Sequence, residues 1–80
     1  MRRSYNFLID SDPSGHILVL NGHEVATFAT LDAAEAEANK IANRAVSGTT
    51  LRFELDFKST LMDLETRAAT LEWESVQAAH

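Results

Sequence analysis

The sequence predicts one α+β domain spanning residues 1–80, with the element order β-β-β-α-β followed by a C-terminal helix. Two observations predict this class. Alternating apolar and polar residues, typical of half-buried strands, recur between turn sequences in residues 4–28. An alanine-rich segment with helical periodicity follows, and a further alternating segment comes after it. The predicted architecture is a single sheet that packs against helices.

The first three predicted strands form an antiparallel meander. Ser4–Asp10 ends at Asp12-Pro13-Ser14-Gly15, which matches a type I turn because proline presets φ at its second position. His16–Leu20 and Glu24–Phe28 flank Asn21-Gly22, the dipeptide that best tolerates the positive φ values of a type I′ hairpin turn.

That hairpin turn predicts the register of the second and third strands. The expected pairs are Leu20 with His23, Val19 with Glu24, Leu18 with Val25, Ile17 with Ala26 and His16 with Thr27. Both faces of the hairpin are then half apolar, whereas a sheet covered on one side shows one clean apolar face. We therefore expect part of each face to be covered.

The predicted helix runs from Leu31 to about Val46, with Thr30 as its N-cap. Ser47-Gly48 is expected to end it, because glycine tolerates the left-handed φ at that position. Its acidic residues come first and its basic residues last, the order that the helix dipole favours. The expected buried stripe consists of Leu31, Ala34, Ala38, Ile41, Ala42 and Ala45.

Two further elements are expected after the helix. Thr49–Lys58 is predicted to be the fourth strand, in a sheet of order 3-2-1-4, because a right-handed crossover allows it to join beside the first. Its apolar row should face the helix and consists of Leu51, Phe53, Leu55 and Phe57. The residues from Ser59 or Thr60 onward are predicted to be helical, because Leu61, Leu64, Ala68 and Leu71 form an apolar seam. The alternative makes Thr70–Val76 a strand.

Composition and charge exclude several classes of function. The chain has no cysteine, which excludes disulfides and thiolate zinc sites. A net charge of −5 disfavours direct nucleic-acid or anionic-membrane binding, because both depend on clustered Lys and Arg. No segment approaches the roughly 20 apolar residues of a membrane span, and no apolar run follows Met1-Arg2-Arg3. The expected location is the cytoplasm.

The titratable residues do not predict an active site. The expected register places His16 and His23 roughly 13 Å apart at ~3.3 Å per residue, whereas two ligands of one zinc each lie within ~2.1 Å of it. Glu54 and Asp56 alternate with basic residues, as on a solvated strand face. No serine stands in a nucleophile elbow, and the glycines are isolated. We predict no catalysis, no metal and no cofactor.

Two features of the predicted C-terminal helix indicate binding instead. Its carboxylates form rows on a helical projection and consist of Asp63, Glu65, Glu72 and Glu74. Such rows fit a basic cleft that binds phosphates, because the cleft attracts carboxylates as well as phosphates. The alternative is that the carboxylates form a solvated helix face. An apolar strip of Met62, Trp73 and Val76 flanks them and either contacts a partner or lies at the margin of the core.

One stretch of the chain resembles known small proteins. After the strand residues Val25 to Thr27, the pattern Phe-x-Thr-x-x-x-Ala-x-Ala opens the helix and is carried by Phe28, Thr30, Ala34 and Ala36. It resembles many small phage and bacterial domains, and some phage-encoded anti-CRISPR proteins are similar in size, acidity and mixed α/β build. The resemblance transfers no binding residue. It implies an inhibitor that docks on a CRISPR effector complex and blocks its access to DNA.

We therefore expect a non-enzymatic inhibitor that binds the basic surface of a nucleic-acid-binding protein complex, in the bacterial host cytoplasm if the chain is phage-encoded. The alternative is a homodimeric accessory domain that buries the second sheet face or the strip of Met62, Trp73 and Val76. An enzyme would need a pocket that brings His16 or His23 within hydrogen-bond reach of a carboxylate.

Overall fold

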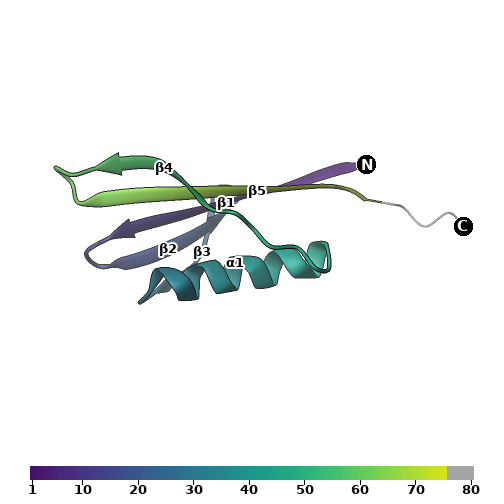
Figure 1. Cartoon of the computed structure of the whole chain (residues 1–80), viewed down its shortest axis with the longest axis horizontal. Coiled ribbons are helices and arrows are strands. Elements are labelled where there is room, and N and C mark those ends of the chain that lie inside the picture. Colours follow the sequence, from purple (N-terminus) through teal and green to yellow (C-terminus); the bar gives the residue numbers. More distant parts are fainter. Residues whose placement is uncertain (76–80) are drawn as a thin grey trace, which may run out of the picture.

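Five strands and one helix make up residues 1–75, the part of the chain that the computed structural model describes. The elements are β1 (Arg2–Asp12), β2 (Gly15–Leu20), β3 (His23–Phe28), α1 (Leu31–Ala45), β4 (Glu54–Ser59) and β5 (Leu64–Glu74). The strands form one antiparallel sheet of order β3-β2-β1-β5-β4, and α1 covers one face of it (Figure 1). The α+β class is confirmed.

Local signals placed the turns and the helix correctly. Asn21 and Gly22 have φ values of 50° and 83°, as a type I′ turn requires. The Thr30 hydroxyl accepts a hydrogen bond from the Ala33 N–H at 3.1 Å and caps α1. Gly48, with φ of 84°, lies just beyond the helix end, as expected.

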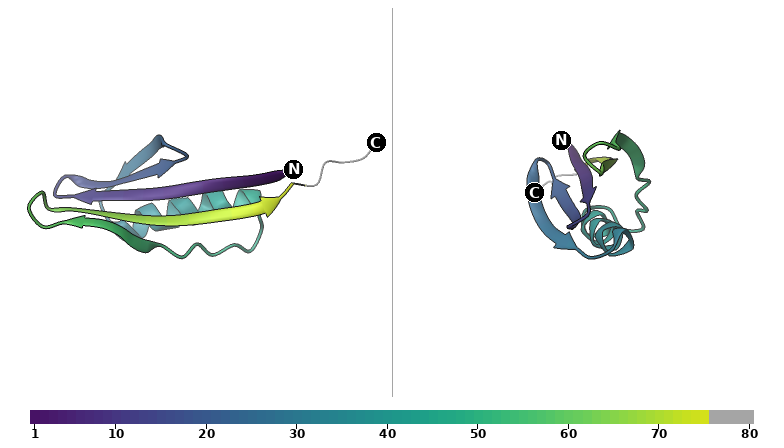
Figure 2. Two further views of the ribbon diagram at one scale, coloured as in Figure 1. Left: turned by 90° about the horizontal axis from the view of Figure 1, so that it is seen from above. Right: turned by 90° about the vertical axis from the view of Figure 1, so that its left-hand side faces the viewer.

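The core lies between α1 and the inner face of the sheet. Ala34, Ala38 and Ala42 are fully buried, and their small side chains let the helix approach the strands closely. They meet the buried Phe7 and Ile9 of β1 and Leu18 of β2. The end-on view in Figure 2 shows the sheet curving partly around the helix.

The predicted register of β2 and β3 is correct only next to their turn. Leu20 pairs with His23 and Val19 with Glu24, but a bulge then shifts the partners by one residue. The remaining pairs are Leu18 with Ala26, Ile17 with Thr27 and His16 with Phe28. The shift places Phe28 on the helix side, where it packs against the core.

The predicted fourth strand is wrong over its first half. Residues 49–53 are not a strand, and β4 begins only at Glu54. The Leu51 N–H instead donates a hydrogen bond of 2.7 Å to the Asn39 side chain of α1. Leu51 is buried, but Leu55 and Phe57 are 54% and 52% exposed. A bulge between these two residues breaks the apolar row that was expected to face the helix.

The predicted C-terminal helix is wrong as well. Leu64–Glu74 forms β5, which lies between β1 and β4, so the expected order 3-2-1-4 is replaced. β5 pairs with β1 without interruption from Arg2 and Glu74 to Ser11 and Glu65. The long β1 strand offers a complete edge, and pairing with it satisfies the backbone while alternate side chains reach the core. The alternative strand over Thr70–Val76 is partly confirmed; Val76 lies outside the described residues.

Candidate functional site

The structure separates the carboxylates that were predicted to form rows. Asp63 lies in the turn between β4 and β5, while Glu65, Glu72 and Glu74 lie on β5. Side chains alternate along a strand, so Glu65 and Glu72 lie on opposite faces. Seven residues also separate them by roughly 23 Å at ~3.3 Å per residue. The rows expected on a helix do not form.

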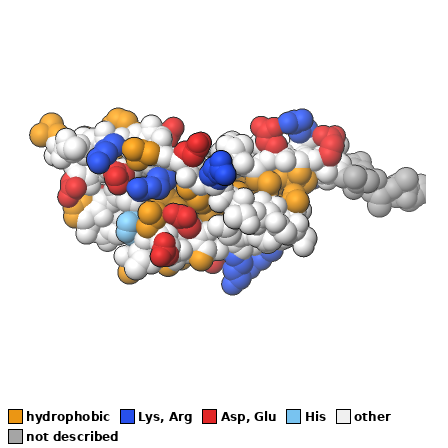
Figure 3. All heavy atoms as spheres, viewed as in Figure 1, with side chains coloured by type: hydrophobic (Ala, Val, Ile, Leu, Met, Phe, Trp, Pro, Cys, Tyr) orange, Lys and Arg blue, Asp and Glu red, His pale blue; other side chains and the backbone are white. Residues whose placement is uncertain are grey.

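Three of these four carboxylates are also neutralised by neighbouring cations. Glu72 pairs with Arg2, and Glu74 lies 3.8 Å from the N-terminal ammonium group. Glu65 lies 3.5 Å from Arg67 and 4.0 Å from Lys58. Figure 3 shows the resulting mixture of acidic and basic side chains where β5 meets the N-terminus. A bare negative surface therefore does not run along β5.

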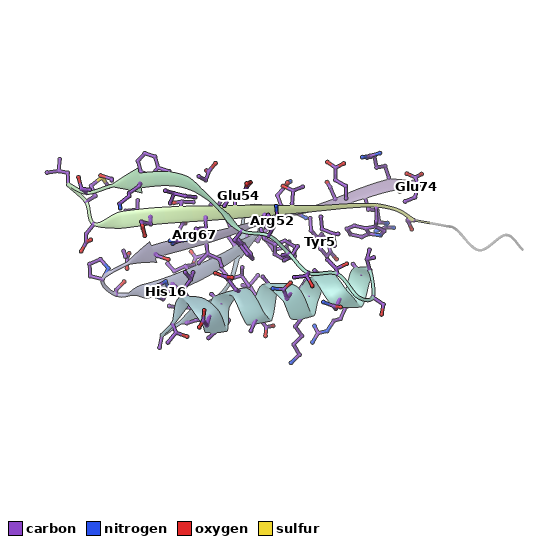
Figure 4. All side chains as sticks on the ribbon, viewed as in Figure 1. Tyr5, His16, Arg52, Glu54, Arg67 and Glu74 are labelled. Atoms are coloured by element: carbon purple, nitrogen blue, oxygen red, sulfur yellow. The ribbon has the colours of Figure 1, made fainter. Side chains whose placement is uncertain are left out.

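The predicted apolar strip is divided in the same way. Trp73 packs edge-on against Tyr5 with a centroid distance of 4.9 Å and is half-buried. Tyr5 points toward α1 and makes an edge contact with Phe7, so Trp73 extends the core at its margin (Figure 4). Met62 lies at the far end of β5, in the turn from β4, and is 67% exposed. Met62 and Trp73 therefore belong to different surfaces.

The sequence interpretation missed a different apolar surface, made by β4 and the turn that follows it. Its members, which we call the hairpin surface, are Leu55, Phe57, Leu61 and Met62. Leu61 is 96% exposed, the highest value among the large exposed apolar residues. The turn is ordered by a 3.2 Å hydrogen bond from the Met62 N–H to the Ser59 hydroxyl. Register places Leu55 on the face of Arg67 and Phe57 on the opposite face, so the hairpin surface covers both faces of the hairpin and its turn. Exposed apolar side chains gathered on one such projecting segment are typical of interaction sites.

A polar cluster lies at the same end of the molecule as the hairpin surface, on the face of the sheet that α1 covers. The Ser11 hydroxyl lies 2.7 Å from Nδ1 of His16, because β1 and β2 pair these two residues directly. Beside them, a hollow of about 480 Å³ opens between the β1–β2 and β4–β5 turns, with Lys58 and Glu65 on its wall. The register of the Asp12–Gly15 turn was a signal that would have predicted the Ser11–His16 pair.

The arrangement of this cluster does not favour catalysis. Ser11 is only 9% exposed, and His16 contacts its hydroxyl rather than a carboxylate. His16 and His23 lie at opposite ends of the β2–β3 ladder. Within residues 1–75, no group of three or more His, Asp or Glu side chains is placed to hold a metal ion. The pair satisfies a buried hydroxyl, which would otherwise be costly.

Figure 4 also shows Arg67 on the α1 side of the sheet, with Glu54 on the opposite side. Arg67 therefore lies on the same face of the sheet as His16 rather than on the outer surface. In the β1–β2 turn, hydrogen bonds from the Ser14 hydroxyl and N–H lower the pKa of Asp12 below its ordinary value. These contacts order the rim of the hollow.

Comparisons with known proteins add no relative: no protein-family model, curated protein or solved structure matches the chain. Within residues 1–75, α1 is too short and too polar to cross a membrane.

Proposed function

We propose that this chain is a non-enzymatic protein-binding domain that contacts its partner through the hairpin surface. The observation that carries the proposal is the exposure of Leu61, 96%, beside Met62, 67%. Covering apolar area contributes about 25 cal/mol per Å², so these side chains gain most when a partner removes them from water. Met is also adaptable in shape, which suits a protein contact.

The partner that we propose is a CRISPR effector complex, in the cytoplasm of a bacterial host, as the resemblance of residues 25–36 implies. Binding would block access to DNA by covering part of the basic surface that holds it. Glu54, Asp56 and Asp63 are exposed around the hairpin surface and provide an acidic rim. Such a rim favours encounter with a basic surface, while the apolar centre supplies most of the affinity.

A binding experiment with a purified CRISPR effector complex tests this proposal. The double variant Leu61→Ser, Met62→Ser should bind at least about tenfold more weakly, since 1.4 kcal/mol corresponds to a factor of ten. Ala36→Ser, on the exposed side of α1, is the matched control and should bind as the wild type does. Unchanged binding of the double variant would show that the hairpin surface is not the contact. Absence of binding by the wild type would show that the effector complex is not the partner.

Charge reversal tests whether binding depends on the acidic rim or on the total charge of the molecule. Asp63→Lys should slow association and make it less sensitive to salt, because it reverses charge beside the contact. The matched control is Glu24→Lys, an exposed residue of β3 at the opposite edge of the sheet, and it should change neither quantity. Equal effects of the two variants would show that binding depends on total charge and not on the hairpin.

A second candidate function is a homodimeric accessory domain that buries the outer face of the sheet. Register and alternation place a row of apolar residues on that face, which consists of Leu8, Ile17, Val19, Phe57 and Ala68. Phe57 is 52% exposed there. Light scattering over a range of concentrations tests the dimer, and Phe57→Lys should convert it to a monomer. A wild-type monomer at every concentration contradicts this candidate.

A further inference from the structure

The outer edge of β5 has two different halves. Its first half pairs with β4, and the last pair is Glu54 with Ala68. Its second half, residues 69–74, extends beyond β4, because residues 49–53 do not continue that strand. The chain between α1 and β4 instead passes along this side of β5 at a level nearer the helix, without pairing with it (Figures 1 and 2). Within residues 1–75, no strand pairs with this half, which we call the open edge.

Hydrogen bonds at the N-terminus show which backbone groups the open edge presents. The Ser75 N–H donates to the Met1 carbonyl at 2.7 Å, and the Met1 ammonium group donates to the Ser75 carbonyl at 3.1 Å. Ser75 therefore directs its backbone groups toward β1. Alternate residues of an antiparallel strand face opposite neighbours, so Thr70, Glu72 and Glu74 direct their N–H and C=O groups outward. Within residues 1–75, no turn or side-chain hydrogen bond uses these groups.

The open edge is also the regular one. β3 and β4, the two strands at the ends of the sheet, each take part in a register shift of the kind produced by a bulge. Bulges twist an edge and discourage the addition of another strand. The pairing of β5 with β1 shows no shift from Arg2 and Glu74 to Ser11 and Glu65. A partner strand therefore meets an undistorted ladder here.

The side chains beside the open edge define the partner that fits. Glu72 and Glu74 lie exposed on the outer face, and the half-buried Leu71 and Trp73 lie on the inner face. The cations that pair with the two glutamates are at the surface, and each carboxylate can accept further hydrogen bonds. A second copy of this edge would place glutamates near glutamates, which is unfavourable.

We infer that the open edge binds an extended segment of a partner protein as an added antiparallel strand, in which Lys or Arg alternates with apolar residues. The basic residues pair with Glu72 and Glu74, and the apolar residues lie over Leu71 and Trp73. Main-chain hydrogen bonds to Thr70, Glu72 and Glu74 supply affinity, and the alternation supplies specificity. This inference does not depend on the hairpin surface, which lies at the other end of β5.

A peptide of sequence Lys-Val-Lys-Val-Lys-Val, blocked at both ends, tests the inference. In amide NMR spectra it should shift the signals of Thr70, Glu72 and Glu74 and slow the hydrogen exchange of these three amides. The same peptide N-methylated at its three lysines, whose N–H groups face β5 in this register, keeps its charge but loses those inter-strand hydrogen bonds, and it should bind at least about tenfold more weakly. The Glu72→Lys, Glu74→Lys variant should weaken binding of the unmodified peptide to a similar extent.

Two outcomes would overturn the inference: equal affinity of the N-methylated peptide, which would indicate purely electrostatic attraction, or signal shifts confined to β3 or β4. The Leu61→Ser, Met62→Ser variant is the matched control and should bind the peptide as the wild type does. Failure of the peptide experiment is thereby separated from failure of the hairpin proposal, because each tests residues that the other leaves unchanged.

Discussion

The region formed by β1–β3 and α1 and the β4–β5 hairpin use their apolar residues in opposite ways. Within residues 1–75, the first region contributes six of the eight buried apolar residues of the core, and the chain beyond α1 contributes Leu51 and Ala69. The hairpin surface instead exposes Leu55, Phe57, Leu61 and Met62. Apolar residues in the first region therefore stabilise the fold, whereas those of the hairpin are available for contact.

The largest expected effect comes from removing a core side chain. Ile9 is completely buried, so Ile9→Ala should lower the free energy of unfolding by about 2–5 kcal/mol through lost burial and a cavity. Leu55→Ala, at a residue that is 54% exposed, should cost less than about 1 kcal/mol. Urea denaturation measures both. Similar losses for the two variants would contradict the division between the regions.

An intermediate effect is expected where α1 orients the chain that leads to β4. The Asn39 side chain accepts the Leu51 N–H at 2.7 Å and donates to the Glu35 carbonyl at 3.0 Å. Asn39→Ala leaves the Leu51 N–H without its partner in a half-buried place, and should cost about 1–3 kcal/mol in urea denaturation. Asn39→Asp keeps an acceptor for that N–H and should lose less. A larger loss of stability for Asn39→Asp than for Asn39→Ala would show that the hydrogen bond to Leu51 is not the contact through which Asn39 stabilises the fold.

The smallest effect concerns pH and the β1–β2 turn. Because hydrogen bonds from Ser14 lower the pKa of Asp12 in the folded state, the ionised carboxylate stabilises the fold above the ordinary value of 3.8. That contribution should disappear as the pH falls through the lowered folded-state pKa. Thermal melting of wild type and Asp12→Asn should therefore differ in pH dependence only in the acidic range. Parallel profiles throughout acid would contradict the role of this carboxylate.

Residues 4–48 were predictable because their signals are local. Asn21-Gly22 specifies a turn by its backbone preferences, and Thr30 and Gly48 mark the two ends of the helix region. The bulge between β2 and β3 carried no such signal, and it shifted every pair beyond Val19. The Ser11–His16 contact follows from the first hairpin, but it becomes visible only when the register of that hairpin is worked out.

The C-terminal region was predicted less well because its pattern fits two structures. Leu61, Leu64, Ala68 and Leu71 have helical spacing, yet Ala69, Leu71 and Trp73 also alternate as the inner face of β5 requires. Residues 59–75 contain no glycine or proline, so the sequence excludes neither a helix nor a strand there. The carboxylate rows expected for a helix depended entirely on this choice, and they vanished with it.

Local sequence signals are enough to specify the α+β class, the β1–β3 meander and α1, since turn chemistry, capping and periodicity all act within a few residues. Tertiary structure decided the rest. β5 is a strand because the edge of β1, about sixty residues earlier in the chain, pairs with it along its whole length. Residues 49–53 leave the sheet because Leu51 is buried beside α1. Contacts this distant are not encoded in local spacing, and the open edge of β5 is their direct consequence.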